Sequence, residues 1–237
     1  MWCGSVPAFG RQFLSRLVVA GCVAAALVSA AWAANSPANA ALPVLLVAAA
    51  LVAAVVAWLE TGPFSAKELT IAATVGGVAA ASRIVFAAVP NVKPATTIVV
   101  IAGVALGLRA GVLAGAITAF VSDMFLGQGP WTPWHILGWA ACGAVGALLA
   151  PLLRRRLALA AVCFALGFAF DFLLDVQGWW SLYPHTRAAF LALVVRGLWF
   201  DLAHATGNAA FALLAGAELR RVLERYGRRV RTEVVWA

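Results

Sequence analysis

The feature that most constrains this chain is a series of apolar runs, most of them long enough to cross a bilayer. A membrane-spanning α-helix needs about 20 predominantly apolar residues. The runs lie near residues 13–33, 42–59, 69–88, 95–108, 110–126, 133–152, 157–175 and 190–216. They are alanine-rich and continuous, whereas a membrane β-barrel needs short alternating segments. The sequence therefore predicts an all-α, polytopic membrane protein with eight helices. The stretch "TTIVVIAGVALGLRAG" (96–111) is barely long enough to span, so one helix there is expected to be short or tilted.

Composition supports this class and argues against two others. Of the 237 residues, 64% are hydrophobic and 11% are charged, while soluble domains have about a quarter of their residues charged. The net charge of +8 comes from basic residues that flank apolar runs, so no nucleic-acid partner is predicted. No metal site or disulfide is predicted from the cysteines, because no Cys-x-x-Cys pair occurs among Cys3, Cys22, Cys142 and Cys163.

The placement of Lys and Arg predicts the orientation, because cytoplasmic connections carry an excess of both. With the N-terminus inside, the external segments hold only Lys93 and Arg187. Both termini are therefore predicted to be cytoplasmic, in the plasma membrane of a bacterium. Residues 1–33 also resemble a secretory signal that ends in "AWA", but their apolar stretch is longer than a signal core. An uncleaved helix is favoured.

Two polar linkers, "NSPANA" and "ETGPFSAKE", divide the chain. They predict an N-terminal helix pair at 1–63, a six-helix membrane core at 64–219 and a basic cytoplasmic tail at 220–237.

Ionisable residues gather toward the predicted outer ends of the core helices. In a bilayer such a residue costs about 2.5–3.5 kcal/mol at the helix centre, so each one is a functional candidate. They are Arg83, Asp123, His135, Asp171, Asp175, Arg196, Asp201 and His204. This one-sided polarity predicts a ligand site near the outer face.

A structural role is the alternative for several of these residues. Asp201, His204 and Asn208 share one helix face, where Asp201 could bond to His204 in a packed network. The network is favoured for Asp201 and Asn208, and it stands level with a ligand role for His204. Asp171 and Asp175 lie one turn apart and repel each other unless a cation separates them. The basic residues that could supply this charge are Arg83, Arg187 and Arg196.

Two predicted outer loops carry distinctive sequences. "GQGPWTPWHILGW" (127–139) holds Trp131 and Trp134 between prolines, where a ligand contact and an interfacial aromatic belt are equal alternatives. "AAVPNVKPATT" (87–97) contains Lys93 and is stiffened by its prolines. The second loop is either an ordinary turn or a lid over the site.

The first core run carries small residues four apart in two rows. Such rows let helix backbones approach closely in lipid, within one protein or between two. The rows are Ala72, Gly76, Ala80 and Ala73, Gly77, Ala81.

With these motifs, residues 64–219 resemble the substrate-binding S components of energy-coupling-factor (ECF) vitamin importers of the ABC type. The most specific part is "GQGPWTPW" together with Arg-x6-Pro-Asn-Val-Lys-Pro at 83–94. The resemblance implies a six-helix, S-component-like core, preceded here by two additional N-terminal transmembrane helices. It also implies that outer loops close over a vitamin and that the first core helix docks on a transmembrane coupling subunit driven by two cytosolic ATPases.

Carried onto this chain, the resemblance implies a set of site residues. The implied substrate-binding residues are Arg83, Asn91, Lys93, Gln128, Trp131, Trp134, His135, Asp171, Trp179, Arg196, Trp199 and His204, and the two small-residue rows would be the docking surface. Relatives that carry cobalt or nickel begin with a His motif that this chain lacks, so a free metal ion is not expected. A corrinoid is the suggested ligand, with no cofactor and no catalytic residue.

Two other classes stay open. A prenyltransferase-type membrane enzyme would use Asp171 and Asp175 to hold Mg²⁺ and diphosphate, but the second Asp-rich motif that it needs does not occur. A stand-alone secondary transporter favours broken helices in two repeats, and no such repeat is visible. The sequence also has no Walker A motif, so ATP hydrolysis would come from partners.

Overall fold

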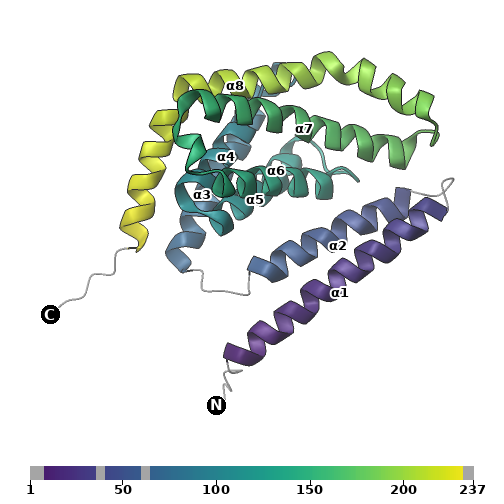
Figure 1. Ribbon diagram of the computed structural model, residues 1–237, viewed down its shortest axis with the longest axis horizontal. Helices are drawn as coiled ribbons and strands as arrows, with labels where there is room; N and C mark the ends of the chain where they lie inside the picture. Colours follow the sequence, from purple (N-terminus) through teal and green to yellow (C-terminus); the bar gives the residue numbers. More distant parts are fainter. Residues whose placement is uncertain (1–7, 36–40, 60–64, 232–237) are drawn as a thin grey trace.

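The computed structural model describes residues 8–35, 41–59 and 65–231, and the regular elements among these residues are all helices, with no strand (Figure 1). The α-helices are α1 (Ala8–Asn35), α2 (Ala41–Leu59), α3 (Ala66–Val85), α4 (Ala95–Leu106), α5 (Leu108–Leu126), α6 (Thr132–Leu148), α7 (Arg156–Leu182) and α8 (Arg187–Arg231). Two 3-10 helices, η2 (Phe86–Ala88) and η3 (Leu152–Arg154), lie between them. The predicted all-α class is confirmed. Residues 1–7, the boundary near Phe64 and the end of the predicted tail lie outside the described residues.

Among the described residues, five helices are long and apolar enough to cross a membrane: α2, α3, α5, α7 and α8. α4 has 12 residues and α6 has 17, so these two helices are shorter. The lengths and composition fit a multi-pass membrane protein.

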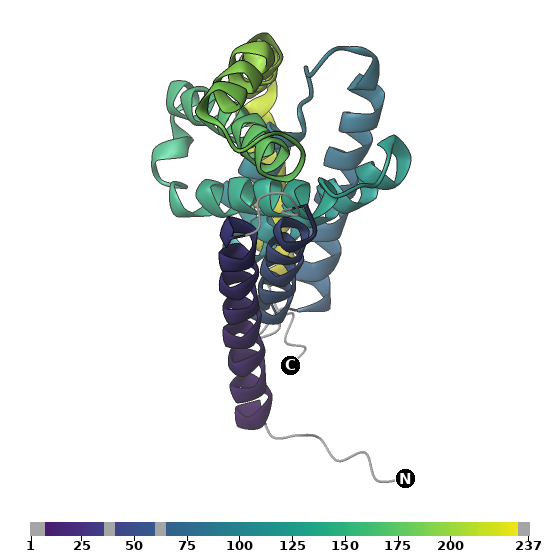
Figure 2. The same cartoon turned by 90° about the vertical axis from the view of Figure 1, so that its right-hand side faces the viewer.

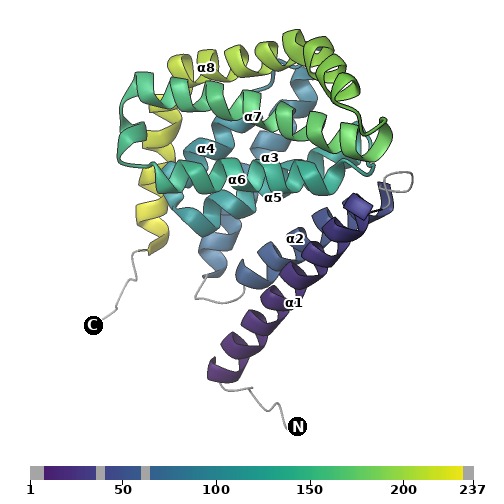
Figure 3. The same cartoon turned by 45° about the vertical axis from the view of Figure 1, so that its right-hand side comes forward.

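The N-terminal helices α1 and α2 form an antiparallel hairpin that lies beside the other helices (Figures 1 and 3). Its contacts with the remaining helices run mainly from α2 to α6 and α7. A view turned by 90° shows the hairpin projecting away from the rest of the molecule (Figure 2). The hairpin is therefore held by one side of the bundle and is not threaded through it.

Helix α4 lies at the centre of α3 to α8 and contacts the other five of these helices: α3, α5, α6, α7 and α8. Val99, Val100 and Ile101 are fully buried, because protein surrounds this helix on all sides. Its enclosure explains how a helix too short to span a bilayer forms part of the core. The sequence had predicted a short helix here.

Local signals account for several helix ends. α3 begins at a capping box, in which the Ser65 hydroxyl accepts from the Glu68 amide at 3.1 Å and the Glu68 carboxylate accepts from the Ser65 amide at 3.1 Å. Gly107 separates α4 from α5 with a φ of 94°, which favours glycine. Pro133 lies in the first turn of α6, where its missing N–H costs nothing.

Three glycines bring α4, α5 and α6 into backbone contact. A Cβ added to Gly143 would overlap the Gly111 carbonyl, and one added to Gly103 would overlap the Gly143 carbonyl. Glycine is required at this crossing because the helices approach too closely for any side chain.

The two small-residue rows of α3 have different environments. Ala72, Gly76 and Ala80 are buried, and a Cβ on Gly76 would lie 2.8 Å from the Ala114 carbonyl oxygen of α5. This row packs inside the chain, so it does not offer a surface to a partner. The second row faces outward: nothing lies within 4 Å of a Cβ on Gly77, and Ala81 is exposed.

Helix α8 continues through Arg231, well beyond the end predicted near residue 216. Its C-terminal part is amphipathic: Leu223 is buried, while Val222 and Tyr226 are partly exposed beside α3. Frequent arginines lower the mean hydropathy there without breaking the helical period, so an apolar-run criterion ends the helix too early.

Candidate functional site

A first charged centre joins α3, α5 and α6. Arg83 donates to the Ser122 hydroxyl at 2.7 Å and forms a salt bridge with Asp123. His135 Nδ1 lies 2.8 Å from Asp123 Oδ2, and because an ionised carboxylate only accepts, Nδ1 is the donor. Asp123 is 1% exposed, and Arg83 and His135 are buried too. The centre therefore holds a buried carboxylate between two nitrogen donors.

A second centre joins α4, α7, α8 and the loop before α4. Asp171 Oδ2 accepts from Asn91 Nδ2 at 2.7 Å and lies 2.9 Å from His204 Nδ1. The other ring nitrogen of His204 lies 3.2 Å from the Thr96 hydroxyl oxygen. All four side chains are buried. His204 is thus oriented from both sides, by a carboxylate and by a hydroxyl.

Two aromatic side chains connect the centres. Trp139 lies under the Arg83 guanidinium, 4.9 Å from ring centroid to Cζ, and its indole N–H donates to Thr96 at 3.0 Å. Phe170 stacks on Trp139 at 4.3 Å between centroids and meets His204 edge-on at 5.7 Å. We call both centres with these two rings the buried polar network.

The loop of residues 89–94 closes over the second centre. Asn91 is buried in the left-handed region with a φ of 50°, and its amide also donates to the Phe200 carbonyl at 2.9 Å. Asparagine tolerates this conformation better than most residues. Lys93 is partly buried; burial, followed by the charge of Arg83, lowers its pKa, whereas Asp171 and Asp123 oppose this shift.

The structure corrects two pairings that the sequence suggested. His204 bonds to Asp171 on α7 and not to Asp201 on its own helix. Arg83 pairs with Asp123, and exposed Arg187 and Arg196 make no ion pair with either α7 carboxylate among the described residues. The favoured structural role of Asn208 is confirmed, since its carbonyl oxygen accepts from the Thr97 amide and hydroxyl.

Of the predicted substrate-binding residues Gln128, Trp131, Trp134 and His135, only His135 joins the buried polar network. Gln128 is exposed. Trp131 is 42% exposed and turns back on its own loop, where its indole N–H donates to the Gly127 carbonyl at 3.3 Å. Trp134 is buried in a cluster with Val44 and Val47 of α2, away from the network.

Three predicted residues on α7 and α8 also lie outside the network. Trp199 is 82% exposed, and the Arg196 side chain is exposed. Trp179 donates to the Thr186 carbonyl at 3.3 Å, and its ring lies 5.2 Å from that of Phe190. These positions were predicted from their expected depth in the membrane. The rotation of each helix about its axis decides which of them face the network.

Sequence reasoning missed Thr96, Trp139 and Phe170 as parts of the site, and it left Asp123 out of the expected ligand contacts. Trp139 entered the sequence analysis only as the last residue of the stretch 127–139, and Phe170 is indistinguishable from other apolar residues in its run. The signal that the sequence did offer is Thr96, a hydroxyl residue in an apolar run. In the structure it is fully buried, so its hydroxyl needs a hydrogen-bond partner.

The arrangement offers hydrogen-bond donors, acceptors and aromatic faces in one buried region. Within residues 8–35, 41–59 and 65–231, no group of three His, Cys, Asp or Glu side chains is placed to hold a metal ion. The network instead fixes charged and aromatic groups on rigid helices, beneath a loop that reaches into it through Asn91.

Comparison with known proteins gives one family match. Residues 64–226 match the model of a family described as a family of unknown function (DUF6580). No curated protein and no solved structure matches the chain.

Proposed function

This chain belongs to the DUF6580 family of unknown function, and we propose that it is the substrate-binding subunit of an importer of the energy-coupling-factor type. In this proposal α3 to α8 form the binding core, and α1 and α2 are an added hairpin. The core captures a vitamin or related micronutrient from outside and docks on a transmembrane coupling subunit driven by two cytosolic ATPases.

The buried polar network is the observation that carries this proposal. Arg83, Asp123 and Asp171 are all buried within or between apolar helices, where ionisable residues are costly and usually functional. The network also lies under the 89–94 loop, which suits a lid that closes over a captured ligand. A purely structural core would achieve the same packing with apolar side chains at lower cost.

The proposed direction of transport requires the network to lie toward the outside. His135 lies in the first turn of α6, whereas Arg154 and Arg155 follow its C-terminal end. By the positive-inside rule the arginine end is cytoplasmic. In a cysteine-free background, Val89→Cys and Gln128→Cys should label with a membrane-impermeant thiol reagent in intact cells, and Arg155→Cys should not. Labelling only at position 155 would reverse the orientation and exclude uptake by this route.

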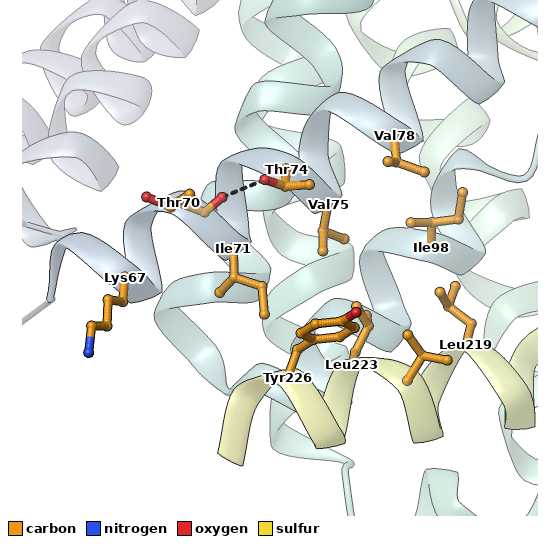
Figure 4. A pocket seen from close by; sticks show the side chains of 11 residues that line it. Lys67, Thr70, Ile71, Thr74, Val75, Val78, Ile98, Leu219, Leu223 and Tyr226 are labelled. Carbon is orange, nitrogen blue, oxygen red and sulfur yellow. Dashed lines mark hydrogen bonds between the residues drawn. The ribbon is translucent and has the colours of Figure 1, made fainter. Parts of the chain in front are cut away.

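The docking surface that fits the proposal is the exposed side of α3. It contains the outward small-residue row at Ala73, Gly77 and Ala81. An apolar groove with a volume of about 530 Å³ lies beside this row, between α3 and the C-terminal part of α8 (Figure 4). The groove is lined by Lys67, Thr70, Ile71, Thr74, Val75, Val78, Ile98, Leu219, Val222, Leu223 and Tyr226.

The two threonine hydroxyls on this surface, of Thr70 and Thr74, are satisfied within α3. The Thr74 hydroxyl donates to the Thr70 carbonyl at 2.8 Å, so it presents mainly its methyl group outward (Figure 4). A helix of the coupling subunit could therefore approach Gly77 closely without leaving a polar group unpaired.

The test is co-purification of the tagged full chain from membranes of its own cells. The parent should retain the coupling subunit and the ATPases, and vesicles containing the assembly should take up the ligand only with ATP. Gly77→Leu should lose the partners. Gly21→Leu is the matched control, because Gly21 also lies in an apolar helix and, like Gly77, has nothing within 4 Å of its added Cβ.

Two results would contradict the proposal. One is a parent chain that purifies without any ATPase, even after cross-linking in the membrane. The other is unchanged partner recovery and uptake in Gly77→Leu, which would remove α3 as the docking helix.

The geometry supports a prenyltransferase less well. Asp171 would have to bind Mg²⁺ there, but its Oδ2 is already engaged by Asn91 and His204.

A further inference from the structure

Helices α7 and α8 carry three carboxylates along their mutual interface, which we call the acidic seam: Asp171, Asp175 and Asp201. The helices run antiparallel with extensive contact, as Figure 1 shows. Asp171 lies opposite His204, and Asp175 lies one turn further along α7, opposite Gly197. The seam therefore continues the second centre of the network toward the α7–α8 turn.

Two of the three carboxylates have no hydrogen-bond or ion-pair partner within the part of the chain that the structure describes. Asp201 is 2% exposed, yet its Oδ2 accepts no hydrogen bond, and the buried Oδ2 of Asp175 accepts none either. Neither side chain forms a salt bridge among the described residues. A buried carboxylate without a partner is costly, so the two together call for a positive group that the described residues do not supply.

Gly197 keeps the space between these carboxylates open. A Cβ added there would lie 3.3 Å from Asp175 Oδ2 and 3.7 Å from Asp201 Oδ1. Both side chains thus point toward the same point on the surface of α8. Since Asp175 is only partly buried, this point is reachable from outside the interface.

Aromatic rings follow the carboxylates along the same interface. Trp179 lies one turn beyond Asp175 on α7, and its ring centroid is 5.2 Å from that of Phe190 on α8. Phe172 meets Phe190 edge-on at 6.1 Å. The faces of aromatic rings attract cations, so acidic and aromatic groups here favour the same kind of ligand.

We propose that the acidic seam binds the cationic group of an organic ligand, with its ammonium or amidinium nitrogen between Asp175 and Asp201 and its apolar part toward Trp179 and Phe190. This inference rests on the proposed function and narrows its substrate to a positively charged micronutrient. It replaces the corrinoid that the family resemblance suggested, since a corrinoid offers no such compact cation.

An organic cation fits the seam better than a metal ion does. No group of three His, Cys, Asp or Glu side chains in the described part of the chain is placed to hold a metal. A nitrogen cation needs less: two acceptors, a nearby aromatic face and room for its hydrogens.

The test compares benzylammonium with benzyl alcohol, its neutral counterpart, in calorimetric titrations of the purified full chain in detergent. Benzylammonium should bind at least about tenfold more tightly, which corresponds to about 1.4 kcal/mol. Asp175→Asn and Asp201→Asn should each abolish this preference while leaving benzyl alcohol binding within a few-fold. Both variants remove charge without removing volume, and each should unfold at or above the midpoint of the parent.

Two glycine variants distinguish an effect on the space between the carboxylates from a general effect on helix packing. Gly197→Ala should weaken benzylammonium binding, because its methyl group enters the space between the carboxylates. Gly178→Ala on the same helix pair is the control, since its Cβ would meet only Leu193 at 4.0 Å. It should bind both probes as the parent does.

Several results would overturn the inference. Equal affinities of the parent for the two probes would exclude a cation site. Mn²⁺ binding that needs Asp201, without a benzylammonium preference, would make the seam a metal site. Proton uptake at Asp201 with no probe preference would make it a protonation site.

Failure of the cation site can be distinguished from failure of the proposed importer function. A neutral co-purifying ligand on a chain that retains its ATPases would refute only the cation site. A benzylammonium preference that depends on Asp201, in a chain without any ATPase partner, would uphold the site and refute the importer.

Discussion

Replacing Arg83 tests the first charged centre most directly. Arg83→Met keeps the length and much of the volume of the side chain but removes the guanidinium. It deletes the salt bridge to Asp123, the 2.7 Å hydrogen bond to Ser122 and the cation–π contact with Trp139. Asp123, which is 1% exposed, would then rely on His135 as its remaining strong donor.

The expected cost follows from this burial. Breaking a buried ion pair from one side costs about 3–5 kcal/mol, because the remaining charge stays out of water. Asp123→Asn should also destabilise, since it leaves the guanidinium without its counter-charge. The double variant removes both charges, so its cost should be lower than the sum of the single costs by about 1–3 kcal/mol.

The assay is reversible unfolding in mixed detergent, monitored by tryptophan fluorescence. It compares the parent, Arg83→Met, Asp123→Asn and the double variant. Arg187→Met is the control, because Arg187 is exposed and should change the free energy of unfolding by no more than about 0.5 kcal/mol. If Arg83→Met behaves like this control, or if the two single changes add without coupling, the pair does not stabilise the bundle as argued.

Three further predictions concern other parts of the fold. Gly143→Ala should prevent stable assembly of the detergent-purified chain, because its methyl group overlaps the Gly111 carbonyl, whereas Gly77→Ala should unfold at the parental midpoint. Trp134→Ala should cost about 3 kcal/mol in unfolding free energy through lost packing against α2, with binding of the co-purifying ligand unchanged; a loss of affinity at parental stability would instead make Trp134 a ligand contact. Burial lowers the pKa of Lys93 below its ordinary 10.5, so the unfolded chain binds more protons between the two values and stability rises with pH there. Lys93→Gln should flatten that rise in thermal midpoints, and an unchanged slope would contradict the burial of its ammonium group.

Much of the helical framework could be predicted from the sequence, because hydropathy is a local property. Each of the eight predicted apolar runs lies largely within one of the helices α1 to α8. The exception in length is α8, whose C-terminal half is too rich in arginine for an apolar run and is stabilised by its contacts with α3 and α4. Tertiary contact, and not composition, extends that helix.

The sequence predicted which polar residues lie near one end of the helix bundle, but it did not predict which of them bond to one another. Arg83, His135, Asp171 and His204 were all expected near one end of the bundle, and the structure places all four in the buried polar network. The expected bond between Asp201 and His204 was wrong, because the α7 carboxylate approaches the imidazole from across the interface. Spacing along one helix cannot show which neighbouring helix competes for the same group.

The amino-acid sequence by itself determined the all-α class, the helices and the position of each charged residue along its helix. All three depend on local hydropathy and helical period. Rotation of each helix about its axis was settled by packing. The Gly103–Gly111–Gly143 crossing sets how α4, α5 and α6 meet, and that geometry turns Trp134 toward α2 and His135 toward Asp123. Neighbouring residues on one helix point about 100° apart, so a difference of one position separates a side chain of the site from one that packs elsewhere.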